Sequence, residues 1–474
     1  MSQVKLQFDR LVTRLILSLA VLILLMVLIG DKSVPRLQMA ELTSQDYAVG
    51  SVWKFDFSRL MDRKSVEDAF EITPKVDGVF SWNGKTMYFE LKDGLESGKN
   101  YLISLDGRAK SLDGKVFTKT WTKQIHTEPM QIAYLLDNKL KIDGKGEYDL
   151  NGLEVQQMVF SKTMIYLLAL KPGENPELWQ LNLENKKLEQ LTFDQKYLNK
   201  NFKISDNGKR IALSRIELGN GGEYASRIEV WLADTGDFVF RKFLNGEAQG
   251  TDFDFSPEGS YLLFRNKDAN FELVNLDEAG PDKQGKFNEK AERLFIGEFA
   301  DAFGFHPFQP KLAFSEYDQE DVYSLNNKLV IFSGDGEKKY LEMGKGVVRQ
   351  AIFTPDGNSL IVLFSGEADN LTGSDDLVES RRFHLYRLDL KDYSIRQLTS
   401  DDDFSELNAI ISPDSRYVLY QRVLATPENL IDPAFQNIQE NLGNLPDREN
   451  WMLDLRTGEN KKLFFKANKF IVKP

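Results

Sequence analysis

Two runs of aspartate are the side chains of this sequence best suited to hold a metal ion. They are Asp375 with Asp376, in the polar stretch 366–382, and Asp401 with Asp402 and Asp403. Carboxylate oxygens are ligands that Ca²⁺ prefers, but neither run has the D-x-[DN]-x-[DN]-G spacing of a calcium loop. The chain carries 60 Lys and Arg against 72 Asp and Glu, a net charge of −12. We interpret both runs as solvated loops and expect no cofactor, with Ca²⁺ as the weaker alternative.

Other residue types that support catalysis are scarce. Cysteine is absent, which excludes disulfides, thiolate metal sites and cysteine nucleophiles. Three histidines, His126, His306 and His384, are too few and too scattered to favour a multi-histidine metal centre. The sequence contains no G-x-S-x-G, H-E-x-x-H or G-x-x-x-x-G-K-[ST] motif. The net negative charge also disfavours nucleic acid as a partner, because it repels phosphate.

An apolar run near the N-terminus predicts a membrane anchor. Residues 15–29 read LILSLAVLILLMVLI, and a helix from Leu11 to Gly30 would be about 30 Å long, the thickness of a bilayer core. The residues expected to face lipid are Leu15, Leu19, Leu22, Leu25 and Ile29. A cleaved signal peptide is the alternative, but no A-x-A-like site follows the run.

Charges that flank the apolar run predict its orientation. Lys5, Arg10 and Arg14 precede it, and Lys32 and Arg36 follow, so the positive-inside rule favours a cytoplasmic N-terminus. The short N-terminal tail is too small to fold. We therefore expect a single-pass protein of the cell membrane, with residues 31–474 outside the cytoplasm.

A small β-sandwich is predicted for residues 46–127, after a stalk at 31–45. Trp53, Phe55 and Phe57 alternate with more polar residues, the period of a strand with one buried face. More such runs follow, separated by Asn-Gly, Asp-Gly and Ser-Gly turns. Short strands at this spacing are typical of sandwiches.

The segment FDFSRLMDRKSVEDAFEITPKVDGVFSWNGKTMYFELKDGLESGKNYLISLDGRAKSLDGK resembles the bacterial SbsA-type Ig-like domain. The features in common are an F-S-x-x-M-D run, a central W-x-G, a Y-x-(V/I) strand and a closing D-x-x-G. The resemblance covers about residues 45–127. It implies a cell-surface spacer or adhesion module rather than a catalyst.

Internal repetition dominates residues 130–474. Six segments align on a Ser, Thr or His that precedes a turn, at intervals of 44, 51, 50, 48 and 58 residues. The aligned residues are Ser161, Ser205, Ser256, His306, Thr354 and Ser412. Between them lie pairs of strands around tight turns, so each repeat has the four strands of a propeller blade.

One such blade leaves both faces of its sheet in water, whereas blades stacked around an axis bury each other. The spacing therefore predicts an all-β chain that ends in a six-bladed β-propeller, with seven blades as the fallback. The segments FSPEGSYLLF, at 255–264, and TPDGNSLIVLF, at 354–364, resemble the TolB-like, PD-type propeller family. That resemblance implies a scaffold used mostly for protein–protein contact.

Residues 426–450 interrupt the strand pattern with TPENLIDPAFQNIQENLGNLPDREN. Asp432 as N-cap, Pro433 at the first helical position and Gly443 as C-cap predict a helix of about ten residues. Its apolar stripe is Phe435, Ile438 and Leu442. Packing on the propeller itself is the plainer interpretation, and docking of a partner is the sharper one.

These patterns together predict a non-enzymatic binding or scaffolding protein of the bacterial cell envelope. Its partners would be the membrane and an envelope protein or wall component, contacted through the propeller loops. A propeller-based hydrolase or lyase acting on envelope glycan or peptide is the alternative. Convergent acidic or histidine side chains at the centre of the propeller would favour the enzyme.

Overall fold

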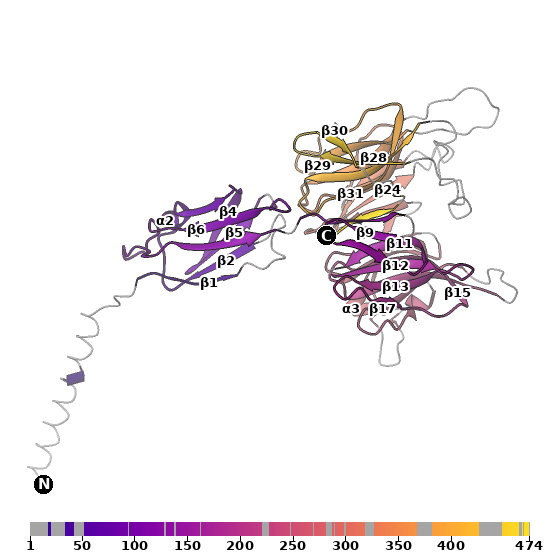
Figure 1. Cartoon of the computed structure of the whole chain (residues 1–474), viewed down its shortest axis with the longest axis horizontal. Helices are drawn as coiled ribbons and strands as arrows, with labels where there is room; N and C mark the ends of the chain where they lie inside the picture. Colours follow the sequence, from indigo (N-terminus) through magenta and orange to yellow (C-terminus); the bar gives the residue numbers. More distant parts are fainter. Residues whose placement is uncertain are drawn as a thin grey trace, which may run out of the picture. The chain divides into compact units, whose positions relative to one another are not determined.

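The computed structural model divides the chain into two compact units (Figure 1). The first contains residues 1–47, 51–92 and 100–126, and the second contains residues 48–50, 93–99 and 127–474. The structure describes residues 18–19, 34–41, 52–92, 94–127, 129–136, 139–161, 163–219, 227–246, 248–268, 270–280, 287–288, 290–297, 300–317, 327–366, 382–425, 448–463, 467 and 469–473.

The first unit is a sandwich of two antiparallel sheets. One sheet has the order β1 (Leu37–Glu41), β2 (Val52–Phe57), β5 (Thr86–Leu91) and β4 (Gly78–Asn83). The other has the order β3 (Phe70–Thr73), β6 (Asn100–Leu105) and β7 (Trp121–His126), and the short helix α2 (Arg63–Glu67) joins β2 to β3. This is the predicted two-sheet architecture.

Aromatic residues at alternate positions fill the core of the sandwich. Trp53, Phe55 and Phe57 of β2 are buried, as their spacing predicts, and the Phe55 ring meets Trp121 of the other sheet edge to face, with 6.0 Å between the ring centroids.

The predicted stalk needs a correction. Its residues 37–41 form β1, because they pair with the otherwise open edge of β2.

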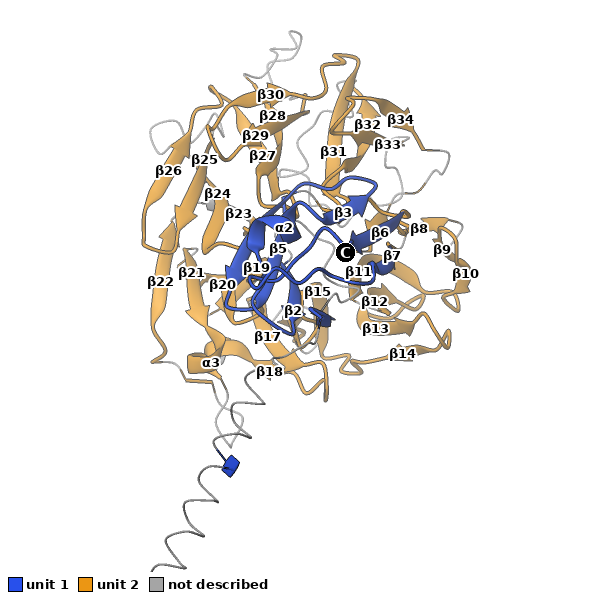
Figure 2. Ribbon diagram, turned by 90° about the vertical axis from the view of Figure 1, so that its left-hand side faces the viewer, with its two compact units in different colours: residues 1–47, 51–92, 100–126 blue, residues 48–50, 93–99, 127–474 orange. Residues whose placement is uncertain are grey.

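The second unit contains seven four-stranded blades among its described residues (Figure 2). Blades 1–3 consist of β11 (Glu154–Ser161), β12 (Met164–Leu170), β13 (Glu177–Asn182), β14 (Leu188–Gln190); β15 (Tyr197–Ile204), β16 (Arg210–Glu217), β17 (Glu229–Asp234), β18 (Arg241–Lys242); and β19 (Ala248–Phe255), β20 (Tyr261–Asn266), β21 (Phe271–Asn275), β22 (Arg293–Gly297). Two short helices, η1 (Phe243–Gly246) and α3 (Leu276–Ala279), lie beside blade 3.

Blades 4–6 follow the same order from the innermost strand outward. They consist of β23 (Ala300–Phe305), β24 (Lys311–Tyr317), β25 (Asn327–Ser333), β26 (Lys338–Leu341); β27 (Val347–Phe353), β28 (Ser359–Ser365), β29 (His384–Asp389), β30 (Ile395–Gln397); and β31 (Phe404–Ile411), β32 (Tyr417–Leu424), β33 (Glu449–Asp454), β34 (Asn460–Lys462). The terminal blade combines β35 (Phe470–Val472) with β8 (Ile132–Leu136), β9 (Lys139–Ile142) and β10 (Gly146–Asp149).

The innermost strands form a closed ring. Contacts run from β11 to β15, β19, β23, β27, β31 and β35, and β35 lies against β11 again. The propeller therefore has seven blades, which corrects the expected six and confirms the fallback. The six aligned segments are blades 1–6. The sequence alignment of the repeats did not include the terminal blade, because its strands come from both ends of the repeat region and lack the turn motif.

The repeated Ser or Thr closes the turn between the first two strands of a blade. The hydroxyl of Ser256 accepts the N–H of Tyr261 at 3.0 Å, that of Thr354 the N–H of Ser359, and that of Ser412 the N–H of Tyr417. In blade 4, His306 Nδ1 accepts two backbone N–H groups in its place. The repeated residue thus has a structural role in the turn.

Two predicted elements lie outside the described residues. The apolar run at 15–29 is described only at Ser18 and Leu19, which are helical. Among the residues that the structure describes, no helix is long and apolar enough to cross a bilayer. The helix expected at 432–443, with Phe435, Ile438 and Leu442, is not described either.

Candidate functional site

Inner strands of the propeller contain β-bulges near their starts. The extra residue is Gln156 in β11, Lys200 in β15 and Arg349 in β27. Each of the three precedes its aligned Ser or Thr by five positions, so the bulges repeat with the blades. Because all blades repeat one topology, these residues lie toward the same end of the ring, opposite the repeated turns.

The bulges let the following side chain join one blade to the next. The amide of Gln157 bonds both the N–H and the carbonyl of Phe202, at 3.1 and 2.8 Å. The amide of Gln350 bonds the N–H and carbonyl of Ala409 in the same way. The bulged end of the ring is therefore held rigid by direct contacts between inner strands.

Basic side chains gather at this end, and we call Arg349, Arg448 and Lys469 the basic cluster. Lys469 comes just before β35, and its Nζ donates to the carbonyl oxygens of Val155, at 2.8 Å, and Gln156. Arg448 comes just before β33 and donates from Nη1 to Gln421 Oε1 at 3.2 Å. Strands of three blades thus bring the cluster together.

Like charges act on one another in the basic cluster. Burial and then the charge of Arg349 lower the pKa of Arg448, and burial and then the charge of Arg448 lower the pKa of Lys469 to about 8. Arg448 Nε is buried and has no hydrogen-bond partner among the described residues. Partly desolvated cations that repel one another favour an anionic ligand, which would lower that repulsion.

The opposite end of the ring is formed by the repeated turns, which bond one another. Asn207 donates to the Glu258 carbonyl of the next blade, His306 Nε2 contacts the Gly357 carbonyl at 3.0 Å, and the Asp356 N–H donates to Ser415 Oγ at 2.9 Å. These bonds explain why the turn residues repeat. They give His306 a structural role, and burial lowers its pKa.

An acidic group also stands at the turn end. The Asp206 side chain is exposed to water on one side, but protein atoms crowd it on the others. This partial burial, and then the charge of Asp254, raise the pKa of Asp206 to about 6. Asp254 itself lies 3.7 Å from Lys203 Nζ. Sequence reasoning missed this pair because its members belong to different blades.

Replacing Asp206 by Asn tests that environment through stability. The folded protein binds the proton of Asp206 more tightly than the unfolded chain does, so this group loses stabilising effect as pH rises from about 4 through 6. The Asp206→Asn variant should equal the natural protein at pH 4 and be more stable at pH 7, by less than about 1 kcal/mol because water screens the site. Urea unfolding at both pH values measures the difference, and a pH-independent difference would contradict the assignment.

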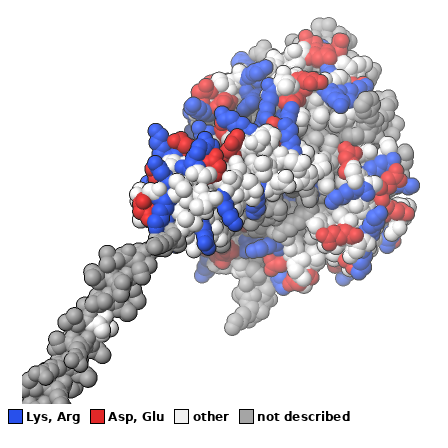
Figure 3. Space-filling model, turned by 60° about the vertical axis from the view of Figure 1, so that its left-hand side comes forward, with Lys and Arg blue, Asp and Glu red and all other residues white. Residues whose placement is uncertain are grey.

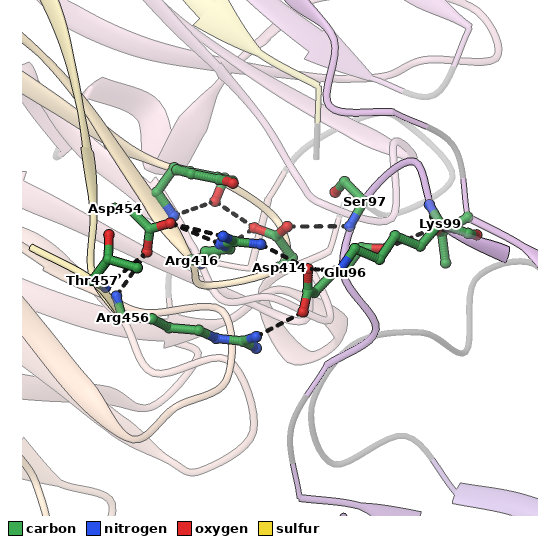
Figure 4. A network of polar contacts seen from close by, with 11 residues as sticks. Glu96, Ser97, Lys99, Asp414, Arg416, Asp454, Arg456 and Thr457 are labelled. Atoms are coloured by element: carbon green, nitrogen blue, oxygen red, sulfur yellow. Dashed lines mark hydrogen bonds and ion pairs between the residues drawn. The ribbon is translucent and has the colours of Figure 1, made fainter. Parts of the chain in front are cut away.

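Figure 4 shows a second polar network, on blade 6. Glu96 accepts from Arg416 Nη1 at 2.7 Å and from Arg456 Nη1 at 2.9 Å, and the Ser97 N–H donates to Asp414 at 3.2 Å. A hydrogen bond from Lys99 and then the charges of the two arginines lower the pKa of Glu96. The network holds residues 94–99 on the propeller, and each of its charged side chains has an ion-pair or hydrogen-bond partner, so we assign it a structural role.

The predicted acidic runs divide between described and undescribed parts of the chain. Asp375 and Asp376 lie outside the described residues. Asp401 accepts from Arg422 Nη2 at 2.6 Å and from the Asp403 N–H, while the Asp402 side chain is 83% exposed. No group of three metal-ligating side chains occurs among the residues that the structure describes. Asp401 thus forms an ion pair with the buried Arg422, while its own side chain remains half exposed.

Arg422 belongs to a buried network between blades 5 and 6. His384 Nδ1 lies 2.8 Å from Glu406 Oε2, and Arg422 Nε lies 3.8 Å from Glu406 Oε1. The guanidinium also stacks over Phe404 and Trp451. His384 therefore fastens two blades, while His126, on β7 of the sandwich, contacts Asn100 at 2.8 Å.

Blades 1 and 2 are fastened by the same arrangement with other residues. Glu177 stands where His384 does, at the start of the third strand, and accepts from Asn199 of the next inner strand at 3.1 Å. Arg215 donates to Asn199 at 2.8 Å and stacks on Tyr197 and Trp231. Its recurrence identifies this network as part of the scaffold.

Comparisons with known proteins find only distant structural similarity. No family model matches the chain, and no curated protein matches it. Solved structures that are similar include a putative TolB from Agrobacterium tumefaciens (15% identity, 60% of this chain and 86% of that chain, TM-score 0.37). Another is an oligogalacturonate lyase in complex with manganese (14% identity, 70% of this chain and 84% of the lyase chain covered, TM-score 0.45). A third is the β-propeller domain of the Trilobed protease from Pyrococcus furiosus (14% identity, 67% of this chain and 84% of the protease chain covered, TM-score 0.43). Because the identities are 14–15% and the TM-scores are below 0.5, the assignment of a propeller depends on the strand pairing described above and not on these neighbours.

Proposed function

We propose that this chain is a membrane-anchored, extracytoplasmic binding protein of the cell envelope, which captures an acidic segment of a protein partner at the basic cluster. The observation that carries this proposal is the convergence of Arg349, Arg448 and Lys469 in a chain of net charge −12. Repulsion within the cluster falls when a carboxylate binds, so an acidic partner gains affinity there. The sandwich, with its resemblance to SbsA-type modules, serves as the spacer between anchor and propeller.

A fluorescent peptide of ten glutamates provides the binding probe. Arg448→Glu should raise its Kd about 30-fold, because the substitution replaces an attractive charge by a repulsive one inside a partly buried cluster. Arg396→Glu, on the exposed strand β30, changes net charge equally and should leave the Kd within about twofold. Fluorescence anisotropy with the full-length protein measures both, with circular dichroism to confirm folding. Equal effects of the two variants would contradict the site.

The pH dependence of peptide binding adds a second readout. Since the pKa of Lys469 is about 8, this side chain is mostly charged at pH 7 and mostly neutral at pH 9. Affinity for the peptide should therefore fall as pH rises through 8, and Lys469→Met should remove that step. A Kd that is constant from pH 7 to 9 would argue against Lys469 as a ligand-binding cation.

Asp206 and Asp254 keep the hydrolase or lyase as a second candidate function. A carboxyl with a raised pKa beside a second carboxyl is the arrangement of a general acid and its partner. The assay is release of soluble fragments from purified cell-wall glycan or its peptides. Turnover by the natural protein that Asp206→Asn abolishes would establish this candidate, and the lack of turnover would leave binding as the function.

A further inference from the structure

One end of the sandwich is built by two loops, and we call residues 58–64 and 109–119 the tip. The loops pair directly, since Leu112 N–H donates to the Leu60 carbonyl at 3.1 Å and Asp62 N–H to the Lys110 carbonyl at 2.9 Å. A β-bridge also joins Met61 to Ser111. The tip is therefore a defined surface and not a set of independent loops.

Apolar side chains project from the tip into solvent. Leu60, Leu112 and Val116 are 54%, 69% and 52% exposed, although Met61 and Phe117 beside them are buried. Single exposed apolar residues are common, but three on one pair of loops group exposed apolar surface in one place, which is typical of an interaction surface.

Basic residues are frequent on the same two loops. The tip carries six Lys or Arg against two Asp, a local net charge of +4 in a chain of −12. The basic residues are Arg59, Arg63, Lys64, Lys110, Lys115 and Lys119. Arg59 pairs with Asp113 at 2.9 Å, which leaves a surplus of positive charge. Figure 3 shows Lys and Arg side chains, with Asp and Glu among them, beside uncharged surface.

The tip is also where the chain enters the sandwich. The Arg36 N–H donates to Ser58 Oγ at 3.0 Å, and the Ser58 N–H donates to the Arg36 carbonyl at 2.9 Å. The apolar run ends at Ile29, so seven residues, 30–36, separate it from the contact with Ser58, at most about 25 Å of extended chain. Asn100 and His126, by contrast, lie at the opposite end of β6 and β7.

We infer that the tip binds the bilayer surface, with Leu60, Leu112 and Val116 in the headgroup region and the basic residues on anionic headgroups. The inference rests on the proposed membrane anchor and goes beyond it, because it assigns the tip a surface of its own. Exposed aliphatic groups together with a surplus of cations are the composition that an anionic interface favours. A short tether keeps that surface in reach.

The absence of cysteine makes a single-label test clean. Leu112→Cys carries an environment-sensitive fluorophore, and the full-length protein is reconstituted in nanodiscs that contain phosphatidylglycerol and a lipid-borne quencher. Val79→Cys is the matched control, since Val79 is also an exposed aliphatic residue of the sandwich, 47% exposed, but lies at the end of β4 away from the tip.

We expect a blue-shifted, quenched signal at residue 112 and a water-like signal at residue 79. Discs of phosphatidylcholine alone, or Lys110→Glu with Lys119→Glu, should at least halve the quenching at residue 112. Equal signals at the two labels would overturn the inference, and quenching that ignores lipid charge would overturn the role of the basic residues. Protein that fails to enter the discs would instead refute the anchor, so the two failures are distinguishable.

Discussion

Phe470→Ala is expected to lower the free energy of unfolding of the propeller by about 3–5 kcal/mol. Phe470 is buried in a cluster with Ile132 of β8 and Leu419 of blade 6, and truncation leaves a cavity there. It also loosens β35, whose three residues pair with β8 and complete the ring. Urea unfolding followed by circular dichroism measures the loss.

Phe193→Ala is the matched control, because the same side chain is removed from a position that is 72% exposed. Its effect should stay within about 0.5 kcal/mol. Hydrogen exchange by mass spectrometry adds a local readout. In the Phe470 variant, exchange should rise first in β8 and β11, the strands beside β35. Equal losses from the two substitutions would contradict a ring closed by the C-terminal strand.

Glu406→Ala is expected to cost about 3–5 kcal/mol of propeller stability. Its carboxylate is fully buried between His384 and Arg422, and its removal leaves the buried guanidinium with less compensating charge. Glu406→Gln keeps an acceptor for His384 and should cost less. The same urea titration measures both variants.

Asp402→Ala provides the contrast for this network. Asp402 is also near His384, at 3.8 Å, but its side chain stands in water, where an ion pair contributes little. We expect a change below about 0.5 kcal/mol. A cost for Asp402→Ala as large as that for Glu406→Ala would show that burial of the network is not what stabilises blades 5 and 6.

The residues at the two ends of the ring differ in whether the sequence alone could have grouped them. Lys200 and Arg349 share a register five positions before the aligned turn residue, so aligning the repeats outward would have placed both at the same end of the ring. No such signal links Arg448 or Lys469, which precede β33 and β35 at unrelated points of the sequence. Asp206 and Asp254 likewise meet only through the contact of β15 with β19.

Periodicity by itself determined the local structure of this protein. Alternation within β2 and the fifty-residue repeat predicted a sandwich and stacked blades, because each pattern reports which face of a strand must leave water. The number of blades was decided only in the tertiary structure, where Phe470 and Ile132, at opposite ends of the repeat region, share one sheet and one cluster. Ring closure is a contact between distant segments, and no local pattern records which distant partner will cover an open edge.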